Sequence, residues 1–257
     1  MREGIEALRT LGLVQEANVT LTGAFPEPLP ILCHLVELGF REVSLKSARL
    51  PPHHPLALTG ASARRLIGGW RRLAKTVLEQ AGRGEFGLLR PILGMCDPFG
   101  RRLVRLAARA RVGDRCGAGR AVLAMDCEGN LYPCASFVGI RGWCVGEVGG
   151  GLDCRLLSGF VAASRGLGGG CARCWAFPLC GGPCQYNSWL IHGSLGRATA
   201  VECAVVKGLS RLAIWFWVAL SAMAPAQAKA LAREAAAATT RDSRPLAQAT
   251  PEAGVTQ

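Results

Sequence analysis

Residues 171–184 read CARCWAFPLCGGPC and place four cysteines within fourteen positions. Two intervening residues between Cys171 and Cys174 let one tight turn direct both sulfurs toward the same metal site. Gly181 and Gly182 permit turns with positive φ, and their amide groups can hydrogen-bond to sulfide. A chain built around this segment must gather several thiols in one place, so this segment constrains the fold more than any other stretch.

The cellular compartment decides what these thiols can do. The N-terminus lacks the uninterrupted apolar core of a secretory signal peptide, so we expect a cytoplasmic protein. Disulfides are uncommon in that reducing compartment, which leaves metal binding or redox chemistry to explain the twelve cysteines. The apolar stretch 212–224 is too short to span a bilayer, and we expect a buried or interfacial helix there and no membrane partner.

Cysteines outside this segment extend the pattern on both sides. Soft thiolates without nearby histidine select zinc or iron–sulfur clusters, and seven thiolates exceed the four ligands of one tetrahedral zinc ion. The four histidines form no ligand pair at helical spacing. The candidate metal and cofactor ligands are therefore Cys116, Cys134, Cys171, Cys174, Cys180, Cys184 and Cys203.

The region 116–210 resembles the SPASM domain, the C-terminal module with two auxiliary clusters in radical S-adenosylmethionine enzymes that modify peptides and proteins. The resemblance rests on the opening at Cys116 with Ala118 and Gly119, and on the motifs GNLYPC, CARCW and CGGPC followed by QYN. Within that superfamily the sequence is most similar to maturases of thioether-linked peptides and of quinohemoproteins. It departs from the usual CGGGC at Pro183, which removes an amide donor near Cys184.

This resemblance implies two 4Fe-4S clusters with interleaved ligands. The first would be held by Cys116, Cys134 and Cys184, and the second by Cys171, Cys174, Cys180 and Cys203. Interleaving joins an early hairpin to later loops, so we expect cluster assembly and folding to be coupled. The clusters would either stabilise the module alone or also transfer electrons or contact the substrate.

The remaining five cysteines are expected to be incidental. Cys127 lies at a predicted hairpin turn, two residues before Gly129, where it should point away from the ligand-bearing strand ends. The first cluster would then keep an iron site open to water or to a substrate cysteine. Cys33 and Cys96 are expected as buried small apolar residues, and Cys144 and Cys154 as spare thiols.

The first part of the chain alternates between helical and strand-like patterns, which is typical of a parallel α/β sheet. Helices are predicted at 2–11, 28–40 and 61–80, and strands at 16–23 and 41–48. About two α/β units are too few to close a barrel of eight. The predicted fold class is α/β: the remnant of a partial (β/α) barrel followed by a small cysteine-rich SPASM domain with a β-hairpin and a C-terminal helix.

The predicted domains follow from a change in the sequence pattern at Cys116, where glycines and cysteines become frequent and the apolar periodicity ends. Residues 1–90 form the barrel-like segment, 91–115 a linker and 116–222 the iron–sulfur SPASM domain, with a hairpin at 121–134 and a closing helix at about 204–222. After residue 223 an Ala-rich tail, 223–257, is expected to be partly helical and then disordered.

A motif of the resembled family is missing. Radical S-adenosylmethionine enzymes bind their catalytic cluster through CxxxCxxC, whereas Cys180 and Cys184 have the first spacing and Asn187 takes the third position. We therefore expect no S-adenosylmethionine site, no catalytic residue and no activity of the chain alone. The interpretation is the C-terminal part of a radical peptide- or protein-modifying maturase, whose partners would be a ribosomal peptide or protein substrate and the missing barrel part.

The charge of the chain leaves a second interpretation open. The formal net charge of +12 favours acidic partners, but no aromatic residues interleave with the basic run at 101–111, so no nucleic-acid partner is predicted. The alternative function is a non-catalytic module that binds zinc at the same thiols and serves as an interaction scaffold.

Overall fold

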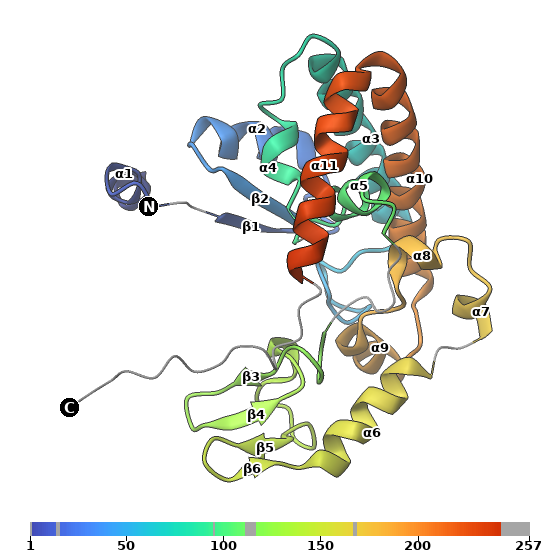
Figure 1. Ribbon diagram of the computed structural model, residues 1–257. Helices are drawn as coiled ribbons and strands as arrows, with labels where there is room; N and C mark the ends of the chain where they lie inside the picture. The colour runs from blue at the N-terminus through green and yellow to red at the C-terminus, as the bar shows by residue number, and fades with distance from the viewer. Residues whose placement is uncertain (1, 14–15, 95, 111–116, 167–168, 243–257) are drawn as a thin grey trace.

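The computed structural model describes residues 2–13, 16–94, 96–110, 117–166 and 169–242. Figure 1 shows a helix-rich body around a small parallel sheet, with a second, antiparallel sheet and one long helix below it. The predicted α/β class is confirmed at this level, because helices and small sheets share one chain.

The parallel sheet confirms the alternation predicted from the sequence. It pairs β1 (Glu16–Leu21) with β2 (Glu42–Ser47) in register, Val19 opposite Leu45, and α2 (Pro28–Glu37) connects the two strands. Leu21 and Leu45 are buried on this sheet. The pairing needs the α2 crossover because parallel strands cannot be joined by a tight turn.

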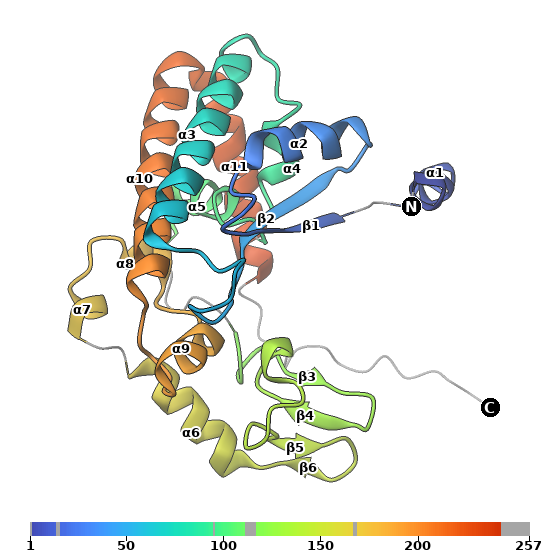
Figure 2. The ribbon, with the colours of Figure 1, turned by 180° about the vertical axis from the view of Figure 1, so that it is seen from behind.

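Helix α3 (Gly60–Gly82) packs beside α2 and along α10 (Ala200–Met223), as the two opposite views in Figures 1 and 2 agree. It begins at Thr59, whose hydroxyl accepts from the Ser62 amide in a capping box. Three buried rings join the helical layer: Trp70 lies 5.4 Å from Phe99, and Phe99 lies 5.8 Å from Phe216, between ring centroids. Aromatic pairs at these separations stabilise a core beyond the area they bury.

Among the described residues one helix, α10, is long and apolar enough to cross a membrane by length and composition. Its residues Leu209, Ala213 and Phe216 are buried, and it packs against α3, α5 (Gly100–Ala107) and α11 (Pro225–Asp242). A central helix of a folded core has this pattern, which agrees with the buried helix predicted for 212–224.

The structure adds detail to two predicted segments. The segment 91–115 was expected to be a linker, yet α4 (Leu89–Ile92) and α5 lie in the main core, because Ile92 and Leu103 are fully buried. The tail from 223 was expected to begin with helical structure, and α11 forms there, packs against α5 and α10 and buries Leu231 and Ala235. Composition alone did not indicate that this helix packs against the core, because tertiary contacts stabilise it.

The smaller part of the molecule contains the predicted hairpin. Strand β3 (Ala124–Met125) pairs with β4 (Asn130–Tyr132), and β5 (Gly146–Glu147) and β6 (Gly151–Leu152) extend the antiparallel sheet. The Asp126 carboxylate accepts from the amides of Glu128 and Asn130 and so closes the turn. The other elements are α1 (Arg2–Thr10), η1 (Ala135–Phe137), α6 (Cys154–Arg165), α7 (Gly169–Ala172), α8 (Phe177–Cys180) and α9 (Gln185–His192).

One buried carboxyl group ties the sheet to the helical layer. Asp97 is fully buried and accepts from the amides of Leu45 in β2, at 2.9 Å, and of Phe99 and Gly100 at the start of α5, both at 2.8 Å. Burial raises the pKa of Asp97 from 3.8 to about 6, against the opposing effect of these amide donors.

This raised pKa predicts how stability depends on pH. The folded protein binds the Asp97 proton more tightly than the unfolded chain, so this group's contribution is complete below pH 4 and is lost as pH rises toward 6. We expect the stability of the wild type relative to Asp97→Asn to fall over that window, by on the order of 3 kcal/mol. Urea unfolding of both proteins between pH 4 and 7 measures it; a difference that is constant or grows with pH would contradict the assignment.

Candidate functional site

Four of the predicted ligands line one small pocket. Cys171 belongs to α7, Cys174 to the turn that follows it, Cys180 ends α8, and Cys203 lies in the first turn of α10. Chain segments that are more than twenty residues apart thus bring together the four thiols that the resemblance assigns to the second cluster. All four are partly buried free thiols.

Local turns explain how the segment folds back on itself. The Cys174 amide donates to the Cys171 carbonyl, at 3.1 Å, and the Phe177 amide donates to the Cys174 carbonyl, at 3.0 Å. Helix α8 then ends at Gly181, whose φ of 71° is left-handed, and Gly182 follows with φ 103°. Side chains with a Cβ rarely adopt these values, so the glycine pair permits the reversal that presents Cys180 to the pocket.

The thiols influence one another electrostatically. Burial raises the pKa of Cys171, and the neighbouring Cys180, Cys174 and Glu202 raise it further, while Lys207 opposes them. Burial likewise raises the pKa of Cys203, with Cys171 and Glu202 adding to the effect. The group is therefore close enough for the ionisation of one thiol to disfavour that of the next, and Lys207 is the cation positioned to offset this charge.

Two of the other predicted ligands, Cys134 and Cys184, each precede a segment of a separate aromatic cluster. Cys134 immediately precedes η1, and Cys184 is the N-cap of α9. Phe137 of η1 lies 5.6 Å from Tyr186 and 5.9 Å from Trp189 of α9, between ring centroids. The segments that start at the two cysteines are thus packed together through aromatic rings.

Cys116 lies outside the described residues, so the structure places two of the three residues assigned to the first cluster. Gly119, three positions further along, donates its amide to the Pro133 carbonyl at 2.9 Å. The described start of this segment therefore adjoins the residue that precedes Cys134.

Within the described ranges, no group of three or more His, Cys, Asp or Glu side chains converges as a site for a metal ion. Four of the cysteines nevertheless line the same pocket.

The remaining cysteines are dispersed over the surface and the core. Cys127 is exposed at the hairpin turn and Cys154 is exposed at the start of α6, while Cys33 and Cys144 are partly buried. Cys96 was expected to be a buried apolar residue, but it is exposed and lines a cavity. Cys96 lies next to Asp97, whose hydrogen bonds determine the path of the backbone at this position. The apolar periodicity of the sequence therefore could not indicate the orientation of the Cys96 side chain.

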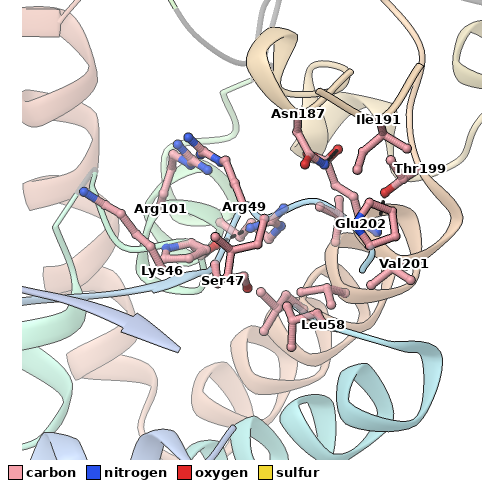
Figure 3. Close-up of a pocket in the computed structure, with 18 of the residues that line it drawn as sticks. Lys46, Ser47, Arg49, Leu58, Arg101, Asn187, Ile191, Thr199, Val201 and Glu202 are labelled. Atoms are coloured by element: carbon pink, nitrogen blue, oxygen red, sulfur yellow. Dashed lines mark hydrogen bonds between the residues drawn. The ribbon is translucent and has the colours of Figure 1, made fainter. Parts of the chain in front are cut away.

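A cavity of about 240 Å³ opens at the carboxyl end of β2 (Figure 3). Figure 3 shows Lys46, Arg49 and Arg101 on one side of it and Asn187 and Glu202 on the other. Ligands of parallel α/β folds bind beyond the carboxyl ends of the strands, which is where this cavity lies. Lys46 and Ser47 at the end of β2, with Arg49 just beyond it, were a signal in the sequence that could have indicated this cavity.

Glu202 connects the cavity with the thiol pocket, because it lines both. One of its carboxylate oxygens accepts from the Asn187 side chain, at 3.1 Å, and the other accepts from the Cys184 amide, at 3.2 Å. These bonds hold α9, which carries Asn187 of the cavity, against the first turn of α10, which carries Cys203 of the thiol pocket.

No family model and no curated protein matches the sequence. Among solved structures, the chain is similar to anSMEcpe, an anaerobic sulfatase-maturating enzyme of the radical S-adenosylmethionine class, in its native form with bound AdoMet. The TM-score is 0.65 at 14% identity, and the match covers 86% of this chain and 60% of that one. The same enzyme with bound AdoMet and the Cp18Cys peptide gives a TM-score of 0.65 at 14% identity, covering 86% and 61%.

Over the matched region the chain has the same fold as part of anSMEcpe. It spans about 60% of the length of the structures it matches. At this identity the similarity concerns the fold, and it agrees with the α/β architecture predicted from the sequence.

Removing a ring from the aromatic cluster is expected to loosen the packing between the segments that follow Cys134 and Cys184. Phe137 is fully buried and contacts four other rings, so Phe137→Ala should lower the free energy of unfolding by about 3–5 kcal/mol. Phe25→Ala is the matched control, because Phe25 is 71% exposed. Limited proteolysis should cut the Phe137 variant within 117–166 first; equal resistance of both variants would contradict a role of this cluster in holding the segment.

Proposed function

We propose that the chain is a 4Fe-4S-binding SPASM protein, the C-terminal part of a radical S-adenosylmethionine maturase that modifies a peptide or protein. The observation that carries the proposal is the pocket lined by Cys171, Cys174, Cys180 and Cys203, four thiols from separate segments and no histidine. Thiolate-only sites are typical of iron–sulfur clusters and of structural zinc. The seven candidate cysteines exceed the four ligands of one zinc ion, which supports the cluster.

The proposed ligand assignment follows the two groups of cysteines. Cys171, Cys174, Cys180 and Cys203 would hold one cluster, and Cys116, Cys134 and Cys184 the other. When bound, such clusters supply one-electron transfer or an iron site for a substrate atom.

The chain's own residues prepare these positions. Phe177, Pro183 and Val206 line the thiol pocket and limit the access of water. Lys207 places a positive charge beside thiols that must lose their protons to bind iron. Glu202 holds α9, and with it Cys184, against the turn of α10 that carries Cys203.

A peptide or protein is the partner that we propose for the cavity at the end of β2. Two of the similar solved structures carry a bound peptide with AdoMet. The cavity has cationic groups on one side and the Asn187–Glu202 pair on the other, so it offers donors and acceptors to a peptide backbone. The proposed domain division is a barrel-like segment at 1–90 and a SPASM domain at 116–222, in a cytoplasmic protein whose S-adenosylmethionine site is supplied by another part of the enzyme.

The iron content tests this proposal. Anaerobic reconstitution of the chain should give roughly eight irons and eight sulfides per chain, since two clusters of four are expected. Cys174→Ala should remove about half of both, because it deletes a ligand of one cluster, whereas Cys154→Ala should keep both because its thiol is exposed on α6. Iron and sulfide assays with the absorption spectrum measure this; one or two zinc ions without sulfide would establish the zinc-binding alternative instead.

The exposed position of Cys127 gives a second test with a matched pair of variants. Cys134→Ala should lose one cluster signal in low-temperature electron paramagnetic resonance, and Cys127→Ala should keep both. The reason is that Cys127 is exposed in the Asp126 turn, on the far side of the hairpin from Cys134. If Cys127→Ala loses a cluster as completely as Cys134→Ala, Cys127 is a ligand and the open iron site is wrong.

A further inference from the structure

A third hollow, besides the cavity at β2 and the thiol pocket, has a volume of about 580 Å³ and is lined by residues of α3 and α10. We call it the α3–α10 groove. The two helices approach closely at Gly208, where an added Cβ would lie 2.8 Å from the Ile67 side chain. The side chains on either side of this contact form the rims of the groove, and they are Arg71 and Lys75 of α3 and Lys207, Arg211 and Trp215 of α10.

The charge of the groove has one sign. Its lining contains four cationic side chains and no carboxylate among the described residues. Arg72, one position from Arg71, is paired with Glu27, but within the described chain none of the four groove cations takes part in an ion pair. Four like charges around one hollow repel each other and attract an anion, so the groove is electrostatically complementary to a negatively charged partner.

The groove also offers apolar contact. Trp215 is 41% exposed at one end, and Val218, one turn further along α10, is 63% exposed. One turn before Trp215 on α10, the Arg211 guanidinium lies 5.1 Å from the ring centroid of Trp175, which belongs to the thiol-bearing segment and is itself exposed. Exposed tryptophan beside arginine is characteristic of surfaces that bind proteins.

We propose that the α3–α10 groove binds an acidic segment of a polypeptide partner, with its carboxylates on the four cations and an apolar side chain against Trp215. A polypeptide segment can enter a groove between two helices, whereas the flat surface of a bilayer cannot. A single-stranded nucleic acid is typically bound on a row of aromatic platforms along a basic track, whereas the groove lining contains one aromatic ring.

Lys207 lies in both hollows, because it lines the groove and the thiol pocket. A partner seated in the groove therefore lies next to the proposed cluster ligands. The proposal itself needs no bound iron, since the groove is made by α3 and α10 side chains.

The test uses the reconstituted full chain and a fluorescein-labelled twelve-residue peptide of six glutamates alternating with leucine and glycine. Fluorescence anisotropy should show binding that weakens with added salt, and a peptide with glutamine in place of glutamate should not bind. Arg71→Glu/Lys75→Glu should weaken binding by about tenfold or more. The control Arg41→Glu/Arg90→Glu changes the net charge equally through two exposed arginines outside the groove and should weaken it less than threefold.

Zero-length carbodiimide cross-linking locates the peptide on the wild type without any variant. The chain has four lysines, Lys46, Lys75, Lys207 and Lys229, and two of them line the groove. Cross-links should map to Lys75 and Lys207. Cross-links at Lys46 or Lys229 alone, or an equal loss of binding in the two double variants, would overturn the proposal.

Competition decides between classes of partner. Phosphatidylserine vesicles and a single-stranded oligonucleotide should displace the labelled peptide less effectively than the unlabelled peptide does. For equal displacement they should require a far higher concentration of negative charges. Displacement by either at lower charge concentration would overturn the choice of a polypeptide. Iron and sulfide are assayed on the same samples, so a chain without clusters that still binds the peptide separates failure of the cluster assignment from failure of this one.

Discussion

The packing of Phe216 against Phe99 is the contact on which the arrangement of the site depends. These rings, with Trp70, hold α10 across α3 and α5 in the centre of the helical layer. The first turn of α10 carries Cys203 and Glu202, and the next turn carries Lys207. A helix anchored at its middle therefore delivers a ligand thiol, a bridging carboxylate and a balancing cation to fixed positions at its N-terminal end.

The thiol pocket carries an energetic cost in the absence of a bound group. Four thiols are gathered in a partly buried space, where desolvation and mutual proximity raise the pKa of Cys171 and Cys203. Protonated thiols contribute little to stability by themselves, whereas under the proposed function coordination of iron would replace the protons and join the segments of α7, α8 and α10. This is the physical reason to expect that the module folds most tightly with its clusters in place.

Much of the architecture followed from local patterns. The strand-like patterns of 16–23 and 41–48 predicted both parallel strands, and the helical pattern of 61–80 predicted the longest N-terminal helix. The resemblance carried by the cysteine motifs implied a set of four ligands, and these four cysteines line one pocket. These features are encoded over short distances in the chain, where periodicity, capping and turn residues act directly.

Features that depend on distant contacts were not predictable in the same way. The burial of α5 and α11 arises from packing against α10, and neither a short apolar stripe nor an Ala-rich segment reveals its partner. The exposure of Cys96 and the cavity beside it depend on how Asp97 ties α5 to β2. The cations of α3 and α10 line one groove only in the tertiary structure, because Arg71 and Lys207 are far apart in sequence.

The central claim is that the cysteine pocket holds iron–sulfur clusters, and anomalous X-ray diffraction from anaerobically grown crystals tests it most directly. Data collected on both sides of the iron and zinc absorption edges distinguish the two metals at each site. The account predicts two iron peaks, one within the pocket of Cys171, Cys174, Cys180 and Cys203 and one beside Cys134 and Cys184. A zinc peak at the first pocket, or iron located away from these thiols, would contradict it.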